Sequence, residues 1–132
     1  MAETLNFELV SPERKLASTE AEAVTIPAMM GDLTAMHNHA PFLTNLRPGY
    51  VVVRNGSSEE GYFVTGGFAE ISNNMVSVLA EEAVEKAAVD RAFIEQKIGR
   101  AEQALADATP SRKQAALQKL NDYKALLGQV PG

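Results

Sequence analysis

The segment from residue 62 to residue 83 limits the possible folds of this chain more than any other. Its apolar residues alternate with small or polar neighbours, as in strands with one buried face, and they are Tyr62, Val64, Ile71, Val76 and Val78. The pairs Gly66-Gly67 and Asn73-Asn74 interrupt the alternation. Both residue types tolerate the positive φ that tight hairpin turns need. The segment therefore predicts three successive strands joined by two tight turns.

Short strands also account for the residues before this segment. The pattern predicts strands at residues 5–9, 14–17, 21–26, 42–46, 50–54 and 62–65. Turn-forming residues separate them at 11–12, 30–32, 47–49 and 55–58. Pro27 and Pro41 are expected at strand ends or edges, because proline cannot donate a hydrogen bond to a neighbouring strand. Many short strands at this spacing indicate a sandwich or a barrel.

The character of the chain changes at residue 80, after which good helix formers dominate. One apolar stripe comprises Ile94, Ile98, Ala101, Leu105 and Ala108, and a second comprises Ala116, Leu120, Tyr123 and Leu127. Between them, Thr109 is a candidate N-cap and Pro110 suits a first helical position, while Gly128 ends the second stripe. Two helices joined by a few residues run antiparallel. We therefore expect an α-helical hairpin at residues 85–132.

Composition excludes several classes of protein. The 132 residues include no cysteine, which excludes disulfides and thiolate metal sites. The net charge of −5 argues against a nucleic-acid partner. No apolar run approaches the roughly 20 residues of a membrane-spanning helix, and the first residues lack the pattern of a signal peptide, so we expect a cytoplasmic protein. Charge is uneven, at −7 over residues 1–86 and +2 over residues 87–132. This distribution is common for two ordinary solvated surfaces, and it also fits a C-terminal part that prefers an acidic neighbour, either the rest of the chain or a partner.

Residues for catalysis are few. His37 and His39 lie two positions apart with Asp32 nearby, so a metal pair is conceivable if the histidines share a strand face, but no further ligand is evident. No nucleophile has an adjacent base. Met29, Met30, Leu33 and Met36 cluster in a segment expected to be a turn-rich loop, where they could form an adaptable contact surface. These features favour a binding module over an enzyme.

Several motifs together resemble one family. His39-Ala-Pro-Phe-Leu43 and Leu46-Arg-Pro-Gly49 precede the Gly66-Gly67 strand, and the Asn73-Asn74 turn leads to Val76-Ser-Val-Leu-Ala80. In order, spacing and total length, these segments resemble the epsilon subunit of the bacterial F-type ATP synthase across nearly the whole chain. The resemblance implies an N-terminal antiparallel β-sandwich, placed at residues 1–84, followed by the C-terminal antiparallel α-helical hairpin at residues 85–132.

The resemblance also implies a function. Such subunits are non-catalytic rotor parts, without a cofactor, that bind the gamma subunit and the ring of c subunits at the cytoplasmic face of the inner membrane without inserting into it. The implied gamma-subunit contacts are Ser11, His39, Pro41 and Phe42, and the implied ring contacts are Met29, Gly31, Asp32 and Leu33. In many members the hairpin inhibits ATP hydrolysis. If it does so here, we expect Arg112, Lys113 and Lys119 to meet an acidic surface on the catalytic alpha and beta subunits.

The sequence departs from the family at two places. Residues 34–38 are less apolar and less rich in Pro and Gly than usual, which affects the expected shape of the ring-facing loop. The family's ATP motif, Ile/Leu-Asp-x-x-Arg-Ala, corresponds to Val89-Asp90-Arg91-Ala92-Phe93-Ile94. Asp90 and the later Arg100 match, but Phe93 supplies no donor to a phosphate and Ile94 adds bulk. We therefore expect weak or absent ATP binding.

Two other functions fit the sequence less well. The first is a β-sandwich recognition module with a helical tail for self-association. The second is a metal hydrolase that uses His37 and His39, which requires bound metal.

Overall fold

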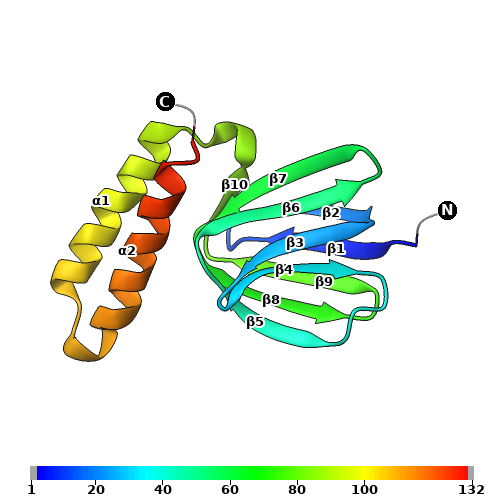
Figure 1. Ribbon diagram of the computed structural model, residues 1–132, viewed down its shortest axis with the longest axis horizontal. Helices are drawn as coiled ribbons and strands as arrows, with labels where there is room; N and C mark the ends of the chain where they lie inside the picture. The colour runs from blue at the N-terminus through cyan, green and yellow to red at the C-terminus, as the bar shows by residue number, and fades with distance from the viewer. Residues whose placement is uncertain (1–2, 131–132) are drawn as a thin grey trace. The chain divides into compact units, whose positions relative to one another are not determined.

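The structure is a computed structural model that describes residues 3–130. The chain divides between Lys86 and Ala87 into two compact units, a β unit and a helical unit (Figure 1). The sequence predicted this boundary between residues 84 and 85, two residues before its position in the structure.

The β unit contains ten strands. They are β1 (Leu5–Val10), β2 (Lys15–Ala21), β3 (Ala23–Ala28), β4 (Gly31–Met36), β5 (Phe42–Leu46), β6 (Gly49–Asn55), β7 (Ser58–Val64), β8 (Gly67–Ser72), β9 (Met75–Ala80) and β10 (Ala83–Glu85). One layer has the order β10-β7-β6-β3-β4 and the other has the order β5-β8-β9-β1-β2. Among residues 3–130, the one strand pairing between the two layers is that of Ala28 of β3 with Leu46 of β5. This arrangement confirms the predicted β-sandwich.

The core lies between the two layers. Alternation places Leu5, Phe7 and Leu9 of β1 on the inner face, and all three are fully buried. The residues from which the strands were predicted, Tyr62, Val64, Ile71, Val76 and Val78, belong to the same core cluster. Burying these side chains is the main source of stability for such a unit.

The Gly66-Gly67 turn forms, but it is not a hairpin. β7 and β8 lie in different layers, so the chain crosses from one layer to the other here. The connection from β9 to β10 crosses back beside it, with Thr65 N donating to Glu82 O at 3.1 Å and Glu81 N donating to Gly66 O at 3.0 Å. Both glycines have positive φ, as predicted. A Cβ on Gly67 would lie 2.1 Å from the carbonyl oxygen of Leu79, so the crossing requires glycine at this position.

Three other expectations need correction. The segment expected to be a loop at residues 29–36 contains β4, which pairs with β3 along its whole length and leaves only Met29 and Met30 in the turn. β1 and β9 are parallel, so the sandwich is not wholly antiparallel. Asn73-Asn74 forms a turn in which neither residue has a positive φ. Among residues 3–130, Asn38 is the one non-glycine residue with a positive φ. The β4 strand was missed because its two ends are rich in turn-forming residues.

The helical unit is the predicted hairpin. A short 3₁₀ turn, η1 (Lys86–Ala88), precedes α1 (Arg91–Asp107), and a second, η2 (Pro110–Arg112), leads into α2 (Lys113–Leu127). The helical region begins later than expected, because residues 83–85 form β10 against β7. Pro110 takes the predicted first position, although the Thr109 side chain makes no capping hydrogen bond. Ile94, Ala101, Leu120 and Tyr123 of the predicted stripes are buried.

Candidate protein-binding surfaces

The turn between β3 and β4 presents methionine to solvent. Met30 is 96% exposed and Met29 about half exposed, and Gly31 follows with a φ of +134°. Asp32 is exposed on β4 opposite Pro27, whereas the Leu33 side chain packs against the core. Three of the four predicted ring contacts are therefore accessible at this tip, which we call the β3–β4 tip (residues 29–32), and Leu33 supports it from inside.

Ser11 lies at the same end of the sandwich as the β3–β4 tip. It begins the β1–β2 turn, where its N–H donates to the Arg14 carbonyl oxygen at 2.9 Å. Neighbouring strands connect this turn to the tip in a row: Val10 pairs with Leu79, Leu79 with Phe68, and Phe68 with Asn45. The carbonyl oxygen of Asn45 then accepts from Met29 N at 2.9 Å.

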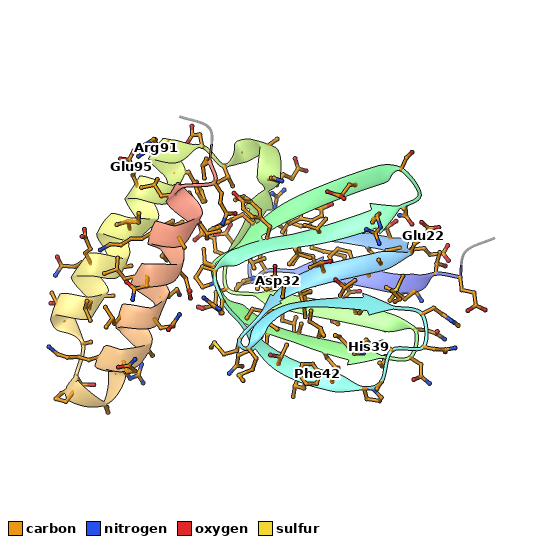
Figure 2. The ribbon with its side chains drawn as sticks, viewed as in Figure 1. Glu22, Asp32, His39, Phe42, Arg91 and Glu95 are labelled. Atoms are coloured by element: carbon orange, nitrogen blue, oxygen red, sulfur yellow. The ribbon has the colours of Figure 1, made fainter. Side chains whose placement is uncertain are left out.

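His39, Pro41 and Phe42 lie at the opposite end. They follow the far end of β4, and Figure 2 labels Asp32 and His39 toward the two ends of the sandwich. Asn38, with a φ of 66°, donates its N–H to the Asn73 carbonyl oxygen at 2.8 Å, which attaches this turn to the β8–β9 turn. The Nδ1 atom of His39 lies 2.6 Å from the Ala40 carbonyl oxygen. The structure therefore does not bring the four predicted gamma contacts together. Through β8 and β9, Phe42 is in register with Phe7 of β1, which is roughly 13 Å from Ser11 along the strand, and His39 lies farther away.

The outer face of β5, β8 and β9 carries exposed apolar side chains that the sequence reasoning missed. Leu43 is 66% exposed, Phe68 44% and Leu79 42%. Phe68 and Leu79 pair directly across β8 and β9. We call these three residues the outer apolar patch. The signal was available, because both Phe68 and Leu79 are out of phase with the core residues Ile71 and Val78 of their own strands.

The two histidines do not form a metal site with Asp32. Both lie in the turn after β4 and not on a strand, so the expected shared strand face does not exist. Asp32 is near the other end of β4. Nδ1 of His37 lies 2.8 Å from a carboxylate oxygen of Glu3, a close contact without hydrogen-bond geometry. Among residues 3–130 no group of three or more His, Asp or Glu residues is placed to hold a metal ion.

In the hairpin, Asp90 has a structural role. It is the N-cap of α1, and its carboxylate accepts a hydrogen bond from Phe93 N at 2.8 Å. The Phe93 ring lies 5.2 Å from Lys97 Nζ in a cation–π contact. Val89 is buried and precedes the helix. Arg100 is exposed on α1.

Of the predicted basic contacts, Arg112 ends η2, Lys113 begins α2 and Lys119 lies in the middle of α2. Arg112 and Lys113 are exposed, and Lys119 is half-buried. Within residues 3–130, no helix combines the length and the apolar composition needed to cross a membrane.

Known proteins are similar to this chain in sequence and in fold. The family model of the ATP synthase delta/epsilon chain, β-sandwich domain, matches residues 4–86. Over 126 residues, 96% of each chain, the sequence is 46% identical to an ATP synthase epsilon chain of Cereibacter sphaeroides. It is 44% identical over the same shares to an ATP synthase epsilon chain of Rhodobacter capsulatus.

Solved structures show the same fold. A chain of the Euglena gracilis mitochondrial ATP synthase, in a structure of OSCP, F1 and c-ring, has a TM-score of 0.74 and 19% identity, covering 96% of this chain and 81% of that chain. A chain in the central stalk and c-ring structure of the Tetrahymena thermophila mitochondrial ATP synthase has a TM-score of 0.63 and 17% identity, covering 95% and 97%. At these identities the likeness concerns the fold alone.

Proposed function

This chain belongs to the family of ATP synthase epsilon chains, and we propose that it is a non-catalytic subunit of the central stalk that links the gamma subunit to the ring of c subunits. The curated relatives, which match over nearly their whole length, are named as epsilon chains. One solved chain of the same fold is part of a central stalk and c-ring assembly.

The outer apolar patch carries this proposal. Three large apolar side chains on one sheet face are costly to leave in water, and such patches mark protein interfaces. The patch is on a rigid sheet, which suits a subunit that transmits torque. Leu43 is the second residue of β5 and faces outward, whereas its neighbour Phe42, which is also exposed, lies on the other face of the strand at its end. We therefore assign Leu43, Phe68 and Leu79 to the main contact with the gamma subunit and Pro41 and Phe42 to its margin.

The β3–β4 tip is the proposed contact with the ring. Its methionines can adapt to a partner surface, and Asp32 adds a charge that affects orientation and specificity more than affinity. Ser11 lies at the same end, so it contacts the gamma subunit near the ring, while His39 contacts it farther away. The subunit would then lie peripherally at the cytoplasmic face of the bacterial inner membrane.

The hairpin is the proposed regulatory element. Residues 87–132 carry a net charge of +2, and Arg112 and Lys113 are exposed. These residues, with Lys119, would meet an acidic surface of the alpha and beta subunits when the hairpin inhibits hydrolysis.

Co-purification tests the two surfaces separately. We expect Phe68→Asp to abolish recovery of the gamma subunit, because a desolvated carboxylate would replace an aromatic contact. Asp32→Arg should weaken recovery of the c-ring and leave ATP hydrolysis by the detached catalytic head intact. Leu117→Asp is the matched control, since Leu117 is an exposed apolar residue of α2 outside both surfaces.

The result that contradicts the proposal is equally clear. If the folded Phe68→Asp protein recovers the gamma subunit as well as the Leu117→Asp protein does, the outer apolar patch is not the interface. Recovery of only a second copy of the chain would instead favour a self-associating recognition module.

A further inference from the structure

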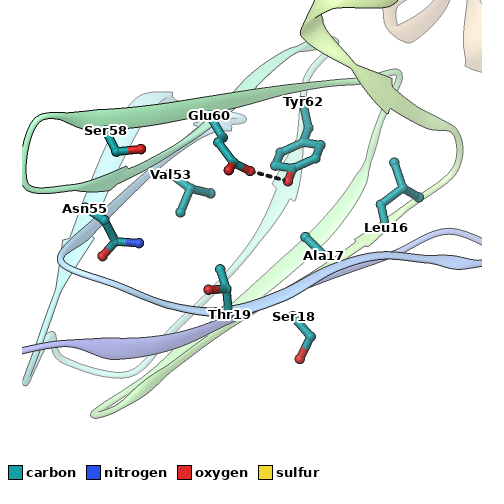
Figure 3. Close-up of a pocket in the computed structure, with 9 residues that line it drawn as sticks. All are labelled: Leu16, Ala17, Ser18, Thr19, Val53, Asn55, Ser58, Glu60 and Tyr62. Atoms are coloured by element: carbon teal, nitrogen blue, oxygen red, sulfur yellow. Dashed lines mark hydrogen bonds between the residues drawn. The ribbon is translucent and has the colours of Figure 1, made fainter.

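A cleft of about 220 Å³ opens between the two layers of the sandwich, apart from the surfaces proposed above (Figure 3). β2 forms one wall, and β6 and β7 form the other. The lining residues that matter here are Leu16, Thr19, Val53, Ser58, Glu60 and Tyr62. Pockets for drug-sized molecules begin at about 300 Å³. This cleft therefore suits a group of only a few heavy atoms.

The inner face of the sandwich becomes polar at this cleft. Across β6 and β7, Val51 pairs with Tyr62 and Val53 pairs with Glu60. Val51, Val53 and Tyr62 belong to the core, so alternation places Glu60 on the inner face as well, while its neighbour Glu59 is on the outer face. Glu60 is nevertheless exposed to solvent, so its carboxylate is hydrated and a ligand can reach it from outside.

Glu60 is held in a defined position. The Tyr62 hydroxyl donates a hydrogen bond to Glu60 Oε2 at 2.9 Å (Figure 3). Burial of the phenol, followed by this hydrogen bond, raises the pKa of Tyr62 to about 12, so the hydroxyl remains a donor at neutral pH. Among residues 3–130, no lysine or arginine forms an ion pair with Glu60. The charge is therefore oriented but not neutralised.

The two walls of the cleft are tied together at one end. Asn55 Nδ2 donates to the Glu20 carbonyl oxygen at 2.8 Å, which links the β6–β7 hairpin to β2. Glu22 N donates to the Arg54 carbonyl oxygen at 2.9 Å close by. The Glu22 carboxylate, labelled in Figure 2, accepts from Gly56 N. The cleft is therefore preformed, and little ordering is needed for a ligand to enter it.

We propose that this cleft binds an alkylammonium group, with Glu60 as its counter-ion. An ammonium group offers three donors, which the Glu60 carboxylate and the hydroxyls of Ser58 and Thr19 can accept. Val53 and Leu16 supply apolar surface for the attached carbon chain. The group belongs either to a small free amine or to a lysine side chain of another protein. The site is independent of the proposed stalk interfaces.

NMR titration of the full chain tests this site with three probes. Butylamine represents a free amine, Nα-acetyl-lysine methylamide represents a lysine side chain, and butanol is the uncharged control. We expect the amide signals of Val53, Ser58 and Tyr62 to shift with the amines and not with butanol. The probe that binds more tightly identifies the source of the ammonium group.

Variants separate the role of Glu60 from general charge effects. Glu60→Gln should weaken amine binding roughly tenfold or more, because it removes a charged hydrogen-bond acceptor. Its amide oxygen can still accept from Tyr62, so the variant should fold, as circular dichroism would verify. Glu59→Gln removes the same charge from the outer face and should leave binding unchanged. Equal weakening by both variants, a response to butanol as large as that to the amines, or no response to either amine would overturn the proposal.

Discussion

At the scale of single residues, the sandwich depends on positions where only one side chain fits. Gly67 is the clearest of these, because its φ is +123° and a Cβ would meet the Leu79 backbone. Gly56 also has positive φ, at +59°, but no atom lies within 4 Å of its ideal Cβ. The sequence alone did not distinguish the two glycines. Only Gly67 has a backbone against it, because the chain crosses between the two layers beside it.

We predict that Gly67→Ala lowers the free energy of unfolding by about 3 kcal/mol or more, from backbone strain and overpacking together. Gly56→Ala should cost only about 1 kcal/mol, since it adds strain without a clash. Urea unfolding of both variants measures the difference. Equal losses would show that the contact with Leu79 relaxes at little cost.

A second residue-scale prediction concerns Tyr62 and alkaline pH. Burial first, then the hydrogen bond to Glu60 and the charges of Glu60 and Glu85, together raise its pKa from 10.0 to about 12. Between about pH 10 and pH 12 the folded state binds more protons than the unfolded state, so the free energy of unfolding falls as pH rises.

Tyr62→Phe should reduce this loss of stability, and chemical denaturation across that pH range would measure it. Part of the slope should remain in the variant, because burial also raises the pKa of Tyr50. An unchanged slope would show that Tyr62 titrates normally in the folded protein.

At the scale of elements, helix α1 begins with a side-chain cap at Asp90. The Asp90 carboxylate is bonded to Phe93 N, and Ile94 is fully buried. Arg91 is the first residue of α1 and Glu95 lies one turn later, both labelled in Figure 2. The position that resembles the family's ATP motif therefore supplies the cap that starts the helix.

We predict that ATP binds this chain more weakly than millimolar. Phe93 offers no donor where the motif has an arginine, and polyphosphate recognition relies on forked arginine donors. Isothermal calorimetry on the full chain is the measurement. Restoring the motif with Phe93→Arg and Ile94→Ala provides the positive control, and tight binding by the unaltered chain would contradict the prediction.

Some elements could be predicted and others could not. The hairpin, with its break at Thr109-Pro110, follows from the spacing of apolar residues, which is local in sequence. β4 was hidden, because Gly31 and Asp32 at its start favour turns and only pairing with β3 makes this segment extended.

At the scale of the whole molecule, the sandwich holds its own core. Every residue of the core cluster lies between Leu5 and Ala83. β10 belongs to this unit, because Glu85 pairs with Tyr62 of β7. The division after Lys86 therefore leaves all ten strands together.

We predict that residues 1–86 fold without the hairpin and still bind the gamma subunit. The shortened chain keeps the outer apolar patch and the β3–β4 tip, and it buries its apolar residues by itself. Circular dichroism and co-purification would test the two halves of this prediction. An unfolded product would mean that the hairpin is needed for stability, and a folded product that does not bind would place the interface in the hairpin.

The sequence by itself determined which residues form most strands, where the two helices are separated, and that Tyr62, Val64, Ile71, Val76 and Val78 face the core. These properties depend on alternation and on Gly and Pro, which act over a few residues. The tertiary structure alone decided that Gly66-Gly67 is a crossing between layers, that Ser11 lies far from His39, and that Glu60 points between the sheets. Each of these depends on which strands pair, and pairing joins residues that are distant in sequence, where local patterns carry no information.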